Sequence, residues 1–232
     1  MSKSSLVSEL RSSLNKQAKH TIAYDLHGEN PTEVKTWIPT GSTVLDLVIA
    51  NREGGGIPVG KITTIAGESQ SGKSLIATQI LANCQKMGGI AIYIDTENAE
   101  VEGSYDPTSQ IGLSARIISR GLRKITEMIG QQKIALVLTN QLKTNIGQMF
   151  GDTRVEPGGK GLPYQASARI WLTRHTGKAN GIITNDQGQL IGYRTSAQIV
   201  KNRFGPPNRT CEFNVMFDLA NGDVGIRDED SW

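Results

Sequence analysis

The stretch Gly67–Ser74, GESQSGKS, has the residue types and spacing of a site for nucleotide phosphates. It satisfies the pattern G-x-x-x-x-G-K-[ST], in which glycines let backbone N–H groups curl round a β-phosphate. Lys73 would neutralise the β- and γ-phosphate oxygens, and the hydroxyl of Ser74 would bind Mg²⁺. An apolar run precedes the motif and a helical pattern follows it, as a phosphate loop requires. We therefore predict a nucleotide and Mg²⁺ site formed by Gly67, Glu68, Ser69, Gln70, Ser71, Gly72, Lys73, Ser74 and Leu75.

Two acidic residues downstream are candidates for the metal and for the attacking water. The run Ile90–Asp95, IAIYID, is apolar and ends in a carboxylate, as a buried strand that ends at an active site does. A phosphate loop requires a second carboxylate, usually on another strand, to hold Mg²⁺ directly or through water. From the residues alone, Asp95 would join Ser74 as a metal ligand, and Glu97 would be a nearby base. The alternative is that both are ordinary acidic residues of a polar loop.

Two groups of basic residues are candidates for binding nucleic acid. The first is Arg116, Ser119, Arg120 and Arg123, which recur at i, i+3, i+4 and i+7 on one face of a predicted helix. The second combines charge, an apolar wedge and adaptable glycines, the mixture that binding of single strands requires: Lys143, Met149, Phe150, Arg154, Gly158, Gly159 and Lys160. A charged helix face usually only covers the surface, and a long loop can be only a surface loop, so both alternatives stay open.

The predicted elements that would position these groups alternate between strand and helix. A strand before the phosphate loop, a helix after it and a second β-rich run form a β-α-β unit, which is typical of a parallel sheet with right-handed crossovers. A further helix, a buried strand and a β-rich tail follow. The predicted fold is therefore α/β, with a mainly parallel central sheet flanked by helices and a β-rich C-terminal part. The expected elements are helices over 40–50, 74–89 and 111–131 and strands over 57–67, 90–95, 133–141, 167–176, 193–204 and 211–219.

The N-terminal residues form a separate pattern. Leu6, Leu10 and Leu14 recur every four residues within 3–17, which predicts a short amphipathic helix with one apolar stripe. A polar linker follows it. The stripe packs either on the core of its own chain or on another subunit. We therefore assign residues 1–38 to an N-terminal helix and linker and 39–232 to the core.

The composition bounds the class of protein without selecting a partner. The 25 Lys and Arg against 22 Asp and Glu give a net charge of +3, too weak to argue for nucleic acid by itself. Two distant cysteines and three scattered histidines speak against a disulfide framework or a structural zinc. No apolar run approaches the roughly eighteen residues of a membrane span, and the N-terminus lacks a secretory pattern. We expect a soluble, cytoplasmic protein with no membrane partner.

Several long blocks follow one another between about Thr40 and Gly225: GESQSGKS, YIDTEN, IGLSARIISRGLRKI, TNQLKTNIGQMFGD, PGGKGLPYQASARI and IVKNRFGPP. Together, and in this order, they resemble the RecA family of homologous-recombination ATPases. The resemblance implies a RecA-like P-loop NTPase core that uses ATP and Mg²⁺. It also implies a homo-oligomeric filament or ring, partnered by single-stranded and double-stranded DNA.

The resemblance implies roles for five side chains. Glu97 matches the acid that activates the attacking water, rather than a metal ligand. Gln141 matches the glutamine that senses the γ-phosphate and relays its presence to the following loop. Lys201 and Arg203 match a basic pair that reaches the nucleotide of the neighbouring subunit, where charge supplied in trans stabilises the transition state. Lys73 completes the predicted catalytic set.

Two segments resemble the mobile DNA loops of the family. Residues 102–112 resemble the first loop, which adds Ile111 and Gly112 to the predicted DNA contacts. Residues 142–161 resemble the second loop, which adds Asn145. The basic helix face predicted above follows directly after the first loop.

The resemblance breaks between Ala99 and Glu100. There the family continues through a helix to a hydrophobic strand that ends in the Walker B Asp, whereas this chain passes directly to EVEG. A helix–strand unit of about thirty residues or more is therefore expected to be absent, as is the small C-terminal domain of many relatives. Hydrolysis is then the activity most in question, unless Asp95 takes the metal role.

Two functions stay open. The first is an ATP-dependent recombinase that binds single-stranded DNA as a filament, pairs it with homologous duplex in recombination and repair, and hydrolyses ATP when DNA stimulates it. The second is a shortened nucleotide- and DNA-binding module with little or no ATPase activity that modulates a full-length recombinase. A P-loop ATPase that does not bind DNA would leave the second loop and the basic helix face unexplained.

Overall fold

The computed structural model describes residues 3–18, 23–24, 33–94, 113–144, 153–157, 161–177 and 181–228. These form two compact units, Met1–Lys35 and Thr36–Trp232. No helix within the described ranges is both long and apolar enough to cross a membrane.

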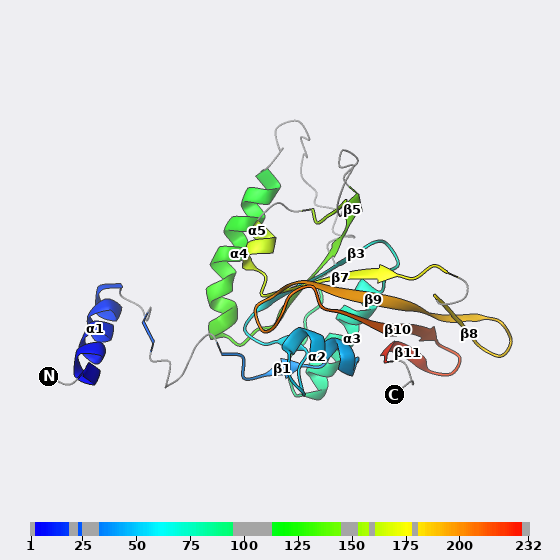
Figure 1. The fold of residues 1–232 in the computed structure, drawn as a ribbon, viewed down its shortest axis with the longest axis horizontal. Helices are drawn as coiled ribbons and strands as arrows, with labels where there is room; N and C mark the ends of the chain where they lie inside the picture. Colours follow the sequence, from blue (N-terminus) through cyan, green and yellow to red (C-terminus); the bar gives the residue numbers. More distant parts are fainter. Residues whose placement is uncertain are drawn as a thin grey trace. The chain divides into compact units, whose positions relative to one another are not determined.

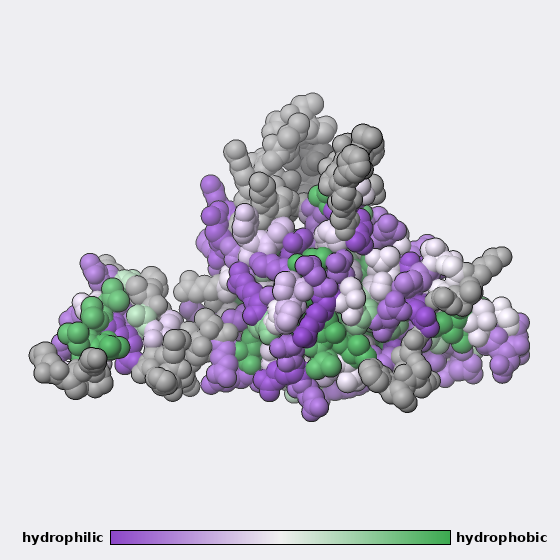
Figure 2. Space-filling view, viewed as in Figure 1, coloured by the Kyte–Doolittle hydropathy of each residue, from purple (hydrophilic) through white to green (hydrophobic). Residues whose placement is uncertain are grey.

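The first unit contains the predicted N-terminal helix, α1 (Lys3–Ala18). Its three stripe leucines are between 44% and 55% exposed, and an apolar patch follows α1 in the space-filling view (Figure 2). The side chain of Asn15 donates to the carbonyl of Ala23 at 2.9 Å and accepts from the N–H of Ala23 at 2.8 Å. These two bonds tie the end of the helix to the backbone that follows it.

In the second unit, helices flank a curled sheet (Figure 1). Its helices are α2 (Thr43–Ala50), α3 (Lys73–Lys86), α4 (Leu113–Gln131) and α5 (Gly161–Gln165). Its strands are β1 (Trp37–Ile38), β2 (Ile57–Pro58), β3 (Ile62–Gly67), β4 (Leu136–Gln141), β5 (Lys143–Thr144), β6 (Arg154–Val155), β7 (Ala168–Arg174), β8 (Ile182–Thr184), β9 (Leu190–Asn202), β10 (Thr210–Asp218) and β11 (Asp223–Arg227).

The central sheet has the order β11-β10-β9-β7-β3-β4, and β8 pairs with β9. Strand β3 pairs in parallel with β4 on one side and with β7 on the other. The remaining pairs of this sheet are antiparallel. The predicted α/β class and the β-rich C-terminal part are confirmed. The sheet is mixed rather than mainly parallel, because the chain after β7 returns directly from strand to strand without the crossover helices that parallel pairs require.

Strand β3 is buried in the core along its whole length. All six residues of Ile62–Gly67 are buried, between β4 and β7 in the sheet. Ile65 packs in one apolar cluster with Ile76 of α3 and with Ile170 and Leu172 of β7. A strand held in this way gives the loop at its carboxyl end a fixed position.

Helix α2 is capped by the serine that precedes it. The side chain of Ser42 accepts a hydrogen bond from the N–H of Leu45 at 3.1 Å, which satisfies one of the unpaired donors of the first turn. Asp228, near the end of the described chain, binds the hydroxyl of Ser42 and the N–H of Thr43. The cap therefore ties α2 to the segment that follows β11.

The predicted strand 90–95 is not formed over the described residues 90–94. Ile90, Ile92 and Ile94 are 90%, 73% and 79% exposed. A strand requires a hydrogen-bonded neighbour. Within the described residues β4 is the last strand of the sheet on this side and pairs only with β3. The apolar pattern is therefore present in the sequence without a described partner to pair with.

Candidate functional site

The phosphate loop connects the end of β3 at Gly67 to the start of α3 at Lys73. Gly72 stands at the N-cap with a φ of 91°, a left-handed conformation that favours glycine. No side-chain hydrogen bond caps α3, and its first turn holds no acidic residue. The first N–H groups of a helix are natural donors to phosphate oxygens.

The loop is too crowded for side chains at its two key glycines. A Cβ at Gly67 would lie 2.4 Å from Oγ of Ser71 and 2.9 Å from the carbonyl oxygen of Leu172. A Cβ at Gly72 would lie 3.2 Å from a methyl carbon of Val215. The bare backbone is therefore what this cradle requires, and the arrangement fits a bound nucleotide phosphate.

The ammonium of Lys73 lies over the loop itself. Its Nζ donates to the carbonyl oxygen of Glu68 at 2.6 Å. The ammonium is therefore held at the backbone of the loop, where it would contact the β- and γ-phosphates of a bound nucleotide. Ser74 follows in the first turn of α3, and its hydroxyl could serve as a ligand for Mg²⁺.

Strands β7 and β9 support the loop through residues that the sequence analysis missed. Arg174 donates to Oε1 of Gln70 at 3.1 Å, and its guanidinium lies 4.4 Å from the ring centroid of Tyr193. Burial raises the pKa of Tyr193, and the charge of Arg174 opposes that rise. Arg174 and Gln70 are 104 positions apart, so no local pattern in the sequence indicates this contact.

The predicted γ-phosphate sensor lies beside the phosphate loop. Gln141 ends β4 and is the register partner of Gly67, which ends β3. The N–H of Leu142 then donates to the carbonyl of Gly67 at 3.0 Å. Since the carboxyl ends of parallel strands meet at one edge of a sheet, the two predicted functional positions are neighbours.

The second predicted DNA loop leaves directly from this point. Lys143 and Arg154 lie on β5 and β6, which pair antiparallel and form the stem of the loop. The guanidinium of Arg154 lies 5.0 Å from the ring centroid of Trp171 and donates to Oγ1 of Thr173 at 3.0 Å. The structure therefore brings two of the predicted DNA contacts together on one stem.

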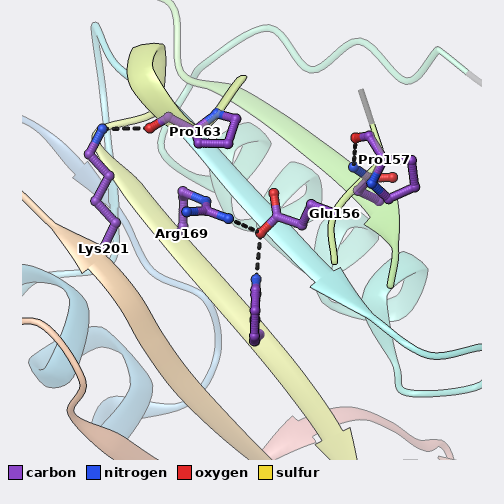
Figure 3. Close-up of polar contacts among 7 residues, drawn as sticks. Glu156, Pro157, Pro163, Arg169 and Lys201 are labelled. Carbon is purple, nitrogen blue, oxygen red and sulfur yellow. Dashed lines mark hydrogen bonds and ion pairs between the residues drawn. The ribbon is translucent and has the colours of Figure 1, made fainter. Parts of the chain in front are cut away.

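A buried carboxylate that sequence analysis missed lies at the end of this stem. Oε1 of Glu156 accepts a hydrogen bond from Arg169 at 2.8 Å and another from the indole N–H of Trp171 (Figure 3). The next residue is tied to β4, because Asn140 donates its side-chain N–H to the carbonyl of Pro157 at 2.9 Å. The one signal in the sequence is alternation along β7, where Arg169 and Trp171 stand between buried apolar residues.

The predicted basic pair lies against α5. Nζ of Lys201 donates to the carbonyls of Pro163 and Tyr164 at 2.7 and 3.0 Å, and Arg203 donates to the carbonyl of Tyr164 at 3.1 Å. Burial lowers the pKa of Lys201, and the charges of Arg203 and Arg169 lower it further. Within its own chain the pair therefore holds the carbonyl end of the helix that follows the second loop.

The predicted basic helix face lies on α4, which forms over Leu113–Gln131. Arg120 and Arg123 are exposed on it. Arg116 and Ser119 belong to the same helix at the predicted spacing. The other predicted site residues lie outside the described residues: Asp95, Glu97, Ile111, Gly112, Asn145, Met149, Phe150, Gly158, Gly159 and Lys160.

Comparison with known proteins identifies one family. The profile of the RecA N-terminal domain matches residues 7–105 and 96–222. Proteins named RecA are similar to this chain in several bacteria. That of Ruminococcus albus is 30% identical over 243 aligned positions, which cover 81% of this chain and 58% of the relative. That of Bifidobacterium breve is 30% identical over 245 positions, 82% of this chain and 60% of the relative. That of Paenarthrobacter aurescens is 32% identical over 243 positions, 81% of this chain and 66% of the relative.

The aligned length exceeds the part of this chain that is aligned. The chain spans less than two thirds of the length of these relatives. In the first alignment, 81% of 232 residues is about 188, so about 55 of the 243 aligned positions lie opposite gaps in this chain. The two stretches that match the family profile overlap at residues 96–105, around the point where the sequence resemblance breaks.

Proposed function

We propose, from the premise that this chain belongs to the RecA family, that it is an ATP-dependent DNA recombinase. It would bind single-stranded DNA as a filament, pair it with homologous duplex, and hydrolyse ATP when DNA is bound. The observation that carries the proposal is the register of β3 and β4, which joins the phosphate loop to the stem of the second loop.

ATP and Mg²⁺ would bind at the crowded glycine loop. The backbone of residues 67–72 would cradle the β-phosphate, Lys73 would neutralise the phosphates, and Ser74 would ligate the metal. Glu97 would orient or activate the attacking water, and Asp95 would assist the metal. Gln141 would sense the third phosphate. The support is that it is the register partner of Gly67, one residue before Leu142, whose N–H donates to the carbonyl of Gly67.

Single-stranded DNA would bind along the second loop. Its stem carries Lys143 on β5 and Arg154 on β6, and the interleaved glycines and apolar residues beyond the stem suit unpaired bases. The basic face of α4 would add contacts to the phosphate backbone, as would residues 111–112. Since each phosphate neutralised on a single strand adds about 0.7 to the logarithmic salt slope, DNA affinity should fall steeply with salt.

Filament contacts would complete the site in trans. Lys201 and Arg203 would reach the nucleotide of the neighbouring subunit and stabilise the charge of the transition state. Their donors are held by the carbonyls of α5 in the single chain, so the pair would exchange those carbonyls for phosphate oxygens when subunits meet. The apolar stripe of α1, with its exposed leucines, is the proposed docking element between subunits.

A second function is favoured by one specific observation, the overlap of the two family-profile matches at residues 96–105. We infer that the positions missing from this chain lie between Ala99 and Glu100, in the core that we assign to 39–232. The two overlapping profile matches and the exposed run Ile90–Ile94 support this placement. The missing unit would carry the carboxylate at the end of a strand that holds Mg²⁺. Without it, the chain would be a nucleotide- and DNA-binding module that turns over little ATP and modulates a full-length recombinase.

Steady-state ATP hydrolysis, measured with and without single-stranded DNA, separates the two functions. The recombinase predicts turnover that DNA stimulates at least about tenfold, and that Lys73→Ala lowers by about two orders of magnitude or more. Absent turnover together with nucleotide-dependent DNA binding would select the module. Absence of both nucleotide and DNA binding would contradict both functions.

A further inference from the structure

The stem of the second loop crosses the strand that leads to the phosphate loop. In the sheet, Ala66 of β3 has Asn140 of β4 and Trp171 of β7 as its register partners. Asn140 binds the carbonyl of Pro157, and Trp171 binds the carboxylate of Glu156. Two consecutive stem residues therefore bridge β4 and β7 across β3, one position before the loop begins. Figure 3 shows Glu156 between Arg169 and Pro157.

Glu156 compensates a charge conflict within the sheet. Arg169 of β7 is the register partner of Lys201 of β9, and like charges directly opposite each other destabilise a sheet. Each cation has its own acceptor. The guanidinium of Arg169 lies 2.8 Å from Oε1 of Glu156, and Nζ of Lys201 donates to the carbonyl oxygen of Pro163 at 2.7 Å. The Glu156 side chain is only 2% exposed and the Arg169 side chain 17%. Removal of the carboxylate would leave a largely buried arginine beside a lysine.

The same carboxylate accepts a hydrogen bond from the indole over which Arg154 lies. Arg154 and Glu156 are two positions apart on the extended stem, so their side chains share a face. That face meets Trp171, which donates its N–H to Glu156 and lies under the guanidinium of Arg154 at 5.0 Å. The indole is thus held by one residue of the stem and supports another.

We propose that Glu156 is a positioning residue of the DNA interface. By holding Arg169 and Trp171 it fixes the C-terminal side of the stem on β7, and so fixes the guanidinium of Arg154 for a phosphate of single-stranded DNA. The choice of single-stranded DNA as the ligand rests on the proposed function. The fixation of the stem is a property of the free protein.

Limited trypsin digestion tests the fixation without DNA. Cleavage after Arg154 requires the stem to open, and its rate reports the population of the open form. Glu156→Ala should raise that rate about tenfold or more, as expected when a charge-assisted contact is lost. Glu53→Gln, at an exposed position in the turn after α2, is the control and should leave the rate unchanged. An unchanged rate in Glu156→Ala would overturn the proposal.

DNA binding tests the consequence. Glu156→Ala and Arg154→Gln should each lower the salt slope for single-stranded DNA by about 0.7, the value for one phosphate. The double variant should lose no more than Arg154→Gln alone, because both changes remove one contact. A merely structural role would leave the slope of the folded protein unchanged. Additive losses, or a normal slope in Glu156→Ala, would overturn the proposal.

Glu156→Gln keeps the shape of the side chain and removes its charge, and it replaces Glu156→Ala in both tests if Glu156→Ala does not yield folded protein.

Two outcomes distinguish failure of the positioning role from failure of the proposed function. If the wild-type chain binds no DNA, the proposed function fails, and the trypsin rates alone decide whether Glu156 fixes the stem. If it binds DNA and the Glu156 variants match wild type, the positioning role fails and the proposed function stands.

Discussion

Two runs that the sequence predicts as strands have opposite structural outcomes in this chain. Ile62–Gly67 is a strand with every residue buried, and it ends in a phosphate loop. Ile90–Ile94 forms no strand, and its isoleucines are at least 73% exposed. The first has β4 and β7 as hydrogen-bonded neighbours. The second has no strand partner in the described part of the chain. The contrast shows that β-propensity indicates a strand only where the fold supplies the adjacent strands.

The largest effect that tests this contrast is truncation of one isoleucine in each run. Ile65→Ala removes a side chain that is 1% exposed, and should lower the free energy of unfolding by about 2 to 5 kcal/mol. Ile92→Ala should change it by no more than about 0.5 kcal/mol, because little apolar surface is buried there. Denaturant unfolding measures both. Equal losses would show that Ile90–Ile94 packs as a strand, and would remove the contrast.

A smaller effect on stability concerns the carboxyl group of Asp46, in helix α2. Burial raises the pKa of Asp46 to about 6, although Thr40 donates to its carboxylate through both N–H and hydroxyl at 2.8 and 2.7 Å. A raised folded pKa means that the folded state binds more protons than the unfolded state between about pH 4 and pH 6. The associated stability is present at low pH and is lost as the pH rises through 6.

Asp46→Asn should remove this pH dependence. An amide oxygen can accept both bonds from Thr40, so the contacts survive while the buried charge does not. Relative to wild type, the variant should be more stable at pH 7.5 than at pH 4.5, by about 2 kcal/mol at most. Asp186→Asn, in the exposed turn between β8 and β9, is the control. A wild-type minus Asp46→Asn difference that is flat with pH would contradict the assignment.

The sequence predicts the local parts of this molecule well. The phosphate loop, the helix after it, the strand that ends at Gln141 and the basic helix are all encoded by contiguous patterns. The adjacency of Gly67 and Gln141 comes from the parallel pairing of β3 with β4, whereas the predicted β-α-β unit ends in the run 90–95, which forms no strand over its described residues. These positions could be assigned because glycine spacing and strand ends carry their own local signals.

The missed parts depend on contacts between distant segments. The bond of Arg174 to Gln70 and the bonds of Glu156 to β7 require knowledge of which strand lies beside which loop. The contact of Lys201 with α5 requires a five-residue helix that contains glycine and proline, which no helix rule predicts. The apolar pattern predicts a strand over 90–95 because periodicity does not report whether a neighbouring strand exists.

The central claim is that the nucleotide site and the DNA loop act as one unit through the paired ends of β3 and β4. The most direct test is the affinity of the purified chain for single-stranded DNA, with and without a non-hydrolysable ATP analogue and Mg²⁺. We expect the analogue to raise the DNA affinity of the wild-type chain about tenfold or more, which corresponds to a coupling free energy of about 1.4 kcal/mol. The DNA affinity of Lys73→Ala should be the same with and without the analogue. Equal DNA affinity with and without the analogue in the wild-type chain would contradict the account.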